Sequence, residues 1–91
     1  QTPLNYALRN GRWDAAKLLL ELGAQPVGAD RDGRTPLHWA ALKKNAELIS
    51  LLLDAKADVA AKDKFGLTPH DVAERAQLDL PEDVRKRLKG S

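Results

Sequence analysis

Residues 35–41 read Thr35-Pro36-Leu37-His38-Trp39-Ala40-Ala41, and this heptapeptide decides the fold. The Thr35 hydroxyl can cap a helix, and Pro36 suits the first helical position because its missing N–H would have no intrahelical partner there. His38 lies three residues after the cap, where its ring can return a hydrogen bond to Thr35. The small apolar face formed by Leu37 and the two alanines must pack closely against a neighbour. The heptapeptide therefore predicts the start of a closely packed helix.

The same motif recurs along the chain at a fixed interval. Thr2-Pro3-Leu4 precedes Thr35-Pro36-Leu37 by 33 residues, and Thr68-Pro69 follows it by the same interval. The offset also relates the leucine triplets at 18–20 and 51–53, and the turn glycines Gly33 and Gly66. A constant period of this length predicts stacked helical units rather than one closed core.

These features resemble the ankyrin-repeat family, whose signature combines a Thr-Pro-Leu-His-x-Ala-Ala helix, a Leu-Leu helix, Gly-Ala and an Asp-x-x-Gly turn. The resemblance covers nearly the whole chain and implies an all-α solenoid of helix-turn-helix units with short β-hairpin or turn fingers. We expect a single domain over residues 1–91, with units at about 1–33, 34–66 and 67–91, as the C-terminal part of a longer array. Helices are expected at residues 2–10, 13–22, 36–43, about 46–54 and, after a delay typical of a capping unit, 81–89.

Three positions depart from the family pattern. Lys44 and Gln77 stand where the first unit has Gly11, and Lys56 stands where it has Gly23. A residue other than glycine in a left-handed helix cap costs roughly 1 kcal/mol. We therefore expect local strain in the second unit.

Composition limits the possible functions. With 43% hydrophobic and 31% charged residues, the chain has an ordinary globular balance and no run long enough to cross a membrane. The absence of cysteine excludes disulfides and thiolate metal sites, and favours an intracellular location, cytoplasmic or nuclear. A net charge of +2 with mixed signs argues against a phosphate-tracking surface.

No catalytic or metal constellation is evident. His38 is explained by helix capping, while His70 replaces a core leucine of the pattern and is expected to be partly exposed. The aspartates at 30, 32, 54, 58 and 63 fall in turns and helix ends, where Asp is locally favoured. The basic run 85–89 suits a helix C-terminus, with a nuclear-localisation or lipid-binding role as the alternative. We expect no enzyme activity, no cofactor and no metal.

A binding surface remains. In ankyrin-like stacks the finger tips and the exposed side of each first helix line a concave face that binds partner proteins. The resemblance points here to Tyr6, Arg9, Arg31, Asp32, Arg34, Trp39, Leu42, Lys43, Lys62, Lys64, Phe65, Leu67 and Arg75.

The character of these residues predicts an acidic and apolar protein partner. Trp39 has Leu42 and Lys43 at i+3 and i+4, so the three share a helix face. Whether Trp39 contacts a partner or packs between units stays open, as does the role of Phe65, which either covers the adjacent finger or contacts a partner. Trp13 replaces a usual leucine and is expected in the core, where it fills space left by the following alanines.

Two other functions compete with this one. The first is a structural segment that associates with missing units or with another chain, because Leu4 and Leu8 of the first helix would be uncovered. The second, less favoured, is nucleic-acid or nucleotide binding through the basic and aromatic residues.

Overall fold

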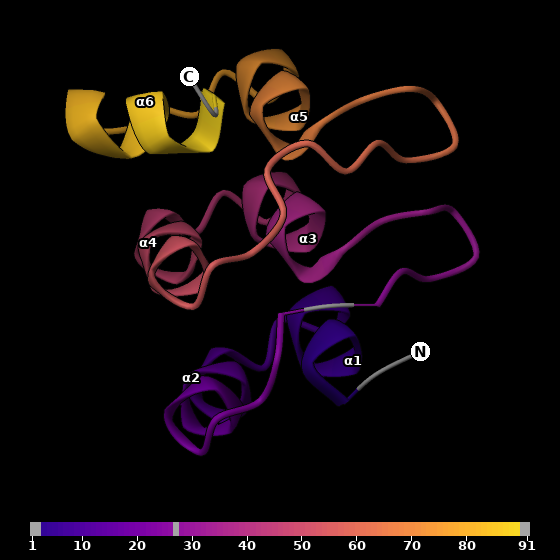
Figure 1. The fold of residues 1–91 in the computed structure, drawn as a ribbon, viewed down its shortest axis with the longest axis vertical. Helices are drawn as coiled ribbons and strands as arrows, with labels where there is room; N and C mark the ends of the chain where they lie inside the picture. The colour runs from indigo at the N-terminus through magenta and orange to yellow at the C-terminus, as the bar shows by residue number, and fades with distance from the viewer. Residues whose placement is uncertain (1–2, 27, 90–91) are drawn as a thin grey trace.

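The computed structural model describes residues 3–26 and 28–89, which form helices and turns without a β-strand. Three helices make an inner row and three make an outer row, and two long turns project from the side of the inner row (Figure 1). The inner row is α1 (Pro3–Arg9), α3 (Pro36–Leu42) and α5 (Pro69–Arg75). The outer row is α2 (Trp13–Glu21), α4 (Ala46–Asp54) and α6 (Glu82–Lys89).

The Thr-Pro signals place the starts of α3 and α5 correctly. Thr35 accepts a hydrogen bond from the His38 backbone and the His38 ring accepts one from the Thr35 N–H, so the predicted capping box is confirmed. Thr68 and Asp71 make the same pair of bonds at α5. Thr2, the expected cap of the first helix, lies outside the described residues.

Helix ends shift by a residue or two from the expected bounds. The helices predicted to end at 22 and 43 stop one residue earlier, since Leu22 and Lys43 are C-caps. Pro81 was expected inside the last helix but precedes it, and its carbonyl accepts the first helical hydrogen bond, from Arg85. Helix α4 has the predicted bounds.

The predicted strain at the helix C-termini is confirmed. Lys44, Lys56 and Gln77 have φ values of 57°, 66° and 55°, in the left-handed region that a Cβ atom disfavours. Each backbone N–H at these positions still bonds to the preceding helix, as from Lys44 to the Ala41 carbonyl at 3.1 Å. The cap geometry is therefore kept at the expense of backbone strain.

Replacing Lys44 with glycine should raise the free energy of unfolding by about 0.5–1 kcal/mol, because relief of the left-handed strain exceeds the entropy that glycine adds to the unfolded chain. Lys43→Gly is the matched control, since this adjacent exposed lysine has a φ of −84°. Urea unfolding should show the two substitutions moving the midpoint in opposite directions. Equal effects would contradict a backbone cause.

The core lies between the two rows and corrects part of the sequence reading. Leu4 and Leu8 are 2% and 0% exposed, so the expectation that they are uncovered is wrong: their face of α1 packs against α2 and α3. On α2 only Ala16 is fully buried, while Ala15 and Leu18 are exposed. Trp13 is half-buried against the core, as expected of a space-filling ring.

Ion pairs connect the outer helices across units. Lys17 on α2 lies 2.6 Å from Glu47 on α4, and Arg87 on α6 lies 2.8 Å from Asp54 on α4. The hydrogen bond to Glu47 raises the pKa of Lys17 above its ordinary value. Because all four side chains are at least 41% exposed, these pairs add little stability.

Acid should weaken the third unit through Asp71. Its carboxylate accepts the Thr68 N–H at 3.1 Å, and this bond lowers the Asp71 pKa below its ordinary value. A lowered folded-state pKa gives stability that is present above the unfolded value of roughly 4 and lost as pH falls through the folded one. Asp71→Asn should therefore be less stable at neutral pH, and the difference should shrink in acid.

Chemical unfolding at a series of pH values measures this effect. Asp79→Asn is the control, because the Asp79 side chain is fully exposed. A stability difference between wild type and Asp71→Asn that is independent of pH would contradict the assignment. The free energy of unfolding of Asp71→Asn should still fall as the pH is lowered, because the pKa of Asp32 is also lowered.

Candidate functional site

The two projecting turns have the same internal hydrogen bonds. In the first finger, residues 30–34, Asp30 Oδ1 accepts the backbone N–H groups of Asp32 and Arg34 at 2.9 and 3.0 Å. In the second, residues 63–67, Asp63 Oδ1 accepts those of Phe65 and Leu67 at 2.9 and 3.0 Å. These bonds hold each turn in shape, so the side chains at the finger tips have fixed starting points.

The fingers also stack on one another. The Lys64 backbone N–H donates to the Asp32 carbonyl at 2.8 Å, and the Lys64 ammonium lies 2.8 Å from Asp32 Oδ1. This side-chain hydrogen bond holds the pKa of Asp32 below its ordinary value. Arg34 Nη1 approaches the other Asp32 oxygen at 3.5 Å. Asp32 therefore connects the two fingers through both its backbone carbonyl and its carboxylate.

Arg34 lies between two aromatic rings. Its guanidinium carbon is 5.3 Å from the centre of the Trp39 ring and 6.0 Å from that of Phe65, and Lys64 Nζ is 5.2 Å from the Phe65 ring. The Trp39 ring is held in position because its Nε1–H donates to Asp30 Oδ2 at 2.9 Å. Cation–aromatic contacts of this kind contribute about 0.5–1 kcal/mol each at exposed sites.

Two depressions meet at Arg34. A groove of about 580 Å³ runs along the first finger and is mostly polar; it is lined by Arg9, Asp30, Arg31, Asp32, Arg34 and Trp39. A cavity of about 250 Å³ between α3 and α5 is mostly apolar; it is lined by Arg34, Leu42, Asp63, Leu67, Val72, Arg75 and Ala76. We call the surface that contains the two fingers, the groove and the cavity the finger face.

The structure brings most of the predicted site residues together on the finger face. The lining residues or stacking partners among them are Arg9, Arg31, Asp32, Arg34, Trp39, Leu42, Lys64, Phe65, Leu67 and Arg75. Tyr6, Lys43 and Lys62 are exposed but line neither depression. Trp39 is half-buried against the core, so it packs within the stack, and it also lines the groove; its contact with a partner stays a prediction.

Sequence reasoning missed three contributors. Asp30 and Asp63 were assigned to turns, which is correct, but Asp30 also anchors Trp39 and Asp63 also lines the cavity. Val72 is almost fully buried, yet it forms part of the cavity floor. The period of 33 residues relates Asp30 to Asp63 and was the available signal.

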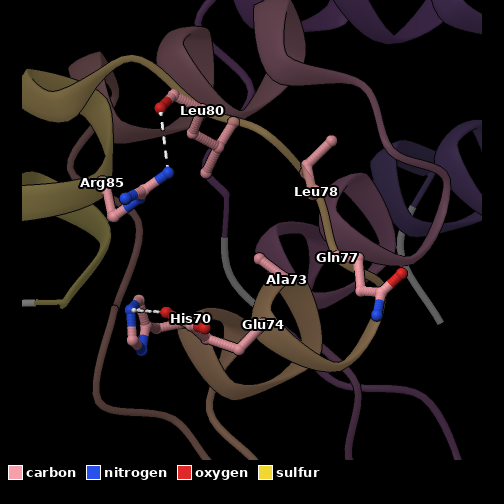
Figure 2. A pocket seen from close by; sticks show the side chains of 7 residues that line it. All are labelled: His70, Ala73, Glu74, Gln77, Leu78, Leu80 and Arg85. Atoms are coloured by element: carbon pink, nitrogen blue, oxygen red, sulfur yellow. Dashed lines mark hydrogen bonds and ion pairs between the residues drawn. The ribbon is translucent and has the colours of Figure 1, made fainter.

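A third hollow lies between α5 and the linker to α6. Figure 2 shows His70 and Glu74 in the lower part of the view, Arg85 and Leu80 above them, and Ala73, Gln77 and Leu78 toward the right. His70 Nε2 lies 3.2 Å from Glu74, and the Arg85 guanidinium donates to the Leu80 carbonyl at 3.4 Å. This hollow is only about 140 Å³, and its polar groups are turned toward each other. His70 is partly exposed, as expected.

Within residues 3–26 and 28–89, no group of three or more His, Asp or Glu side chains is arranged to hold a metal ion. No helix in the same ranges is long and apolar enough to cross a membrane. The chemistry that the finger face offers is charge pairing, aromatic stacking and apolar burial.

Comparison with known proteins identifies the fold. A family model described as ankyrin repeats, in three copies, matches residues 1–63. The chain belongs to the ankyrin-repeat family. The human neurogenic locus notch homolog protein 4 is 43% identical to this ankyrin chain over 86 residues, which are 92% of the chain and 4% of that protein.

Other relatives also extend far beyond the matched segment. Inversin of Gallus gallus is 44% identical over 76% of this chain and 6% of its own length. The ankyrin repeat and LEM domain-containing protein 1 homolog of Caenorhabditis elegans is 47% identical over 66% of this chain and 8% of its own length. The chain thus spans less than a tenth of these three relatives. The all-α ankyrin solenoid predicted from the sequence is confirmed, with turns in place of hairpin strands in the described fingers.

Proposed function

We propose that this ankyrin domain is a noncatalytic module that binds a partner protein through its finger face. The observation that carries the proposal is the contact of Arg34 with the rings of Trp39 and Phe65, at the point where Arg34 lines both the polar groove and the apolar cavity. Aromatic and arginine side chains supply most of the binding energy in protein interfaces. Here they are held in place before any partner arrives, so little ordering entropy is lost on binding.

Exposure and charge at the finger tips support the same face. Phe65 is 62% exposed although it is large and apolar, which fits a contact residue better than a cover for the adjacent finger. Arg31 is exposed and forms no ion pair among the described residues. A basic rim around apolar anchors favours an acidic partner and speeds its approach.

Selection from a displayed library of random peptides, followed by binding assays on substituted proteins, tests the proposal. Phe65→Ala and Lys64→Glu should weaken selected peptides about fivefold or more. Leu22→Ala and Lys17→Glu are matched controls on the outer row: Leu22 is exposed, and Lys17 is paired and about as accessible as Lys64. Peptides that respond only to the outer-row changes would overturn the proposal.

An assembly function is the second candidate. Leu18 and Leu22 are 54% and 75% exposed, whereas Leu51, which lies one period after Leu18, is half-buried in α4, a helix that packs against both α2 and α6. The exposed side of α2 therefore suits another repeat unit, which a second copy of this chain can supply. Sedimentation at high concentration should show a dimer that Leu22→Glu dissociates. A strictly monomeric protein would count against this candidate.

Nucleic-acid binding is less favoured because Asp30 and Asp32 line the same groove as the arginines. A flat response in a low-salt titration with RNA and DNA would remove it. The intracellular location expected from the absence of cysteine stays a prediction.

A further inference from the structure

The cavity between α3 and α5 has an apolar floor and a charged rim. Leu42, Leu67, Val72 and Ala76 form the floor, with Leu42 at 36% exposure on its open side. Cavities of roughly 150 Å³ in protein cores accept a benzene molecule. At about 250 Å³ this cavity therefore has room for one aliphatic side chain of a partner and part of its backbone.

The rim carries more available positive than negative charge. Asp63 is only 7% exposed, and its Oδ1 accepts two N–H groups of its own turn. Arg34 is held by Asp32 through Nη1, while its buried Nε has no hydrogen-bond partner. Arg75 is exposed and forms no ion pair with any described residue. A carboxylate entering beside the cavity would meet Arg75, which forms no ion pair with a described residue, and Arg34, which is shared with Asp32.

From this arrangement we propose the chemistry of the partner, an inference that rests on the proposed function. The finger face takes an extended acidic segment with one leucine-like side chain. That side chain enters the α3–α5 cavity, and a neighbouring Asp or Glu pairs with Arg75, the guanidinium that forms no ion pair with a described residue. The adjacent groove, with Arg31 at its edge, receives a second acidic residue. Charge selects the segment, and burial of the aliphatic group holds it.

Fluorescence anisotropy with labelled synthetic peptides tests the inference. The probe has one Leu flanked by Asp and Glu in a Gly/Ser background; one analogue replaces Leu by Ser and another replaces the acids by Asn and Gln. The Ser analogue should bind roughly tenfold more weakly or worse, because an aliphatic burial is lost. The amide analogue should also bind more weakly, and its affinity should vary less with salt.

Protein variants assign each effect to a residue. Arg75→Gln should weaken the acidic probe roughly threefold to fivefold and leave the amide analogue unchanged. Arg12→Gln, at an exposed arginine of the α2 N-terminus, is the control and should leave the binding of both peptides unchanged. Ala76→Leu fills the cavity, so it should reduce the Leu probe to the affinity of the Ser analogue. Circular dichroism checks that this variant folds. The comparison of the Leu probe with the Ser analogue on the unsubstituted protein tests the cavity without any variant.

The outcomes separate the two proposals. Equal binding of the Leu probe and both analogues, or indifference to Arg75→Gln, would overturn the inference. If library peptides nevertheless depend on Phe65 and Lys64, the finger face still binds proteins, but with another chemistry. If library peptides are insensitive to Phe65 and Lys64 as well, both proposals fail.

Discussion

Replacing His38 with alanine should lower the free energy of unfolding by about 3 kcal/mol. The ring is completely buried, and both nitrogens are used. Because a backbone N–H can only donate, Nδ1 must accept from Thr35 at 3.2 Å, which places the proton on Nε2. Nε2–H then donates to the Leu67 carbonyl at 2.7 Å, in the next finger. Alanine removes the capping bond, the bond between units and the volume of the ring.

Glutamine at this position separates the contributions. His38→Gln keeps a side chain that can return the capping bond to Thr35, as in the usual capping box, but it cannot reproduce the rigid reach of the ring to Leu67. We expect it to lose about half of the stability that His38→Ala loses. Urea unfolding followed by circular dichroism measures both. A loss below about 1 kcal/mol for His38→Ala would contradict the double role assigned to the ring.

Gly33→Ala is expected to have the second largest effect, about 2 kcal/mol. Gly33 has a φ of 74°, so any Cβ costs about 1 kcal/mol in strain. A Cβ here would also lie 3.1 Å from both the Asp63 Cα and the Lys64 backbone nitrogen, which are parts of the next finger. The fingers would have to separate, and the Lys64 to Asp32 backbone bond would lengthen.

Gly66 provides a matched control for this substitution. Its φ of 77° is nearly the same, but a Cβ added there meets no atom within 4 Å. Gly66→Ala should therefore lower the free energy of unfolding by about 1 kcal/mol, through backbone strain alone. Equal losses for the two alanine variants would show that finger packing adds nothing. Because stacked fingers also position Arg34 and Phe65, Gly33→Ala should weaken peptide binding more than Gly66→Ala.

Part of the candidate site was predictable because the family resemblance named its positions. Trp39 and Leu42 share a helix face by spacing alone, and both line the finger face. Tyr6, Lys43 and Lys62 fit the same positional rule, but exposure alone does not make them line a depression. The contacts of Arg34 with Trp39 and Phe65 connect the first finger and α3 with the second finger, and no local sequence pattern specifies the distance between the two fingers.

The sequence by itself determined the helices, their caps and the strained positions. Capping at Thr35 and Thr68, and the left-handed backbone at Lys44, depend on residues only a few positions apart, so their physics can be read along the chain. Only the tertiary structure decided which leucines are covered and where the charged groups meet. Burial of Leu8, exposure of Leu18 and the second bond of His38 follow from how whole units pack, because each depends on atoms from another unit or helix.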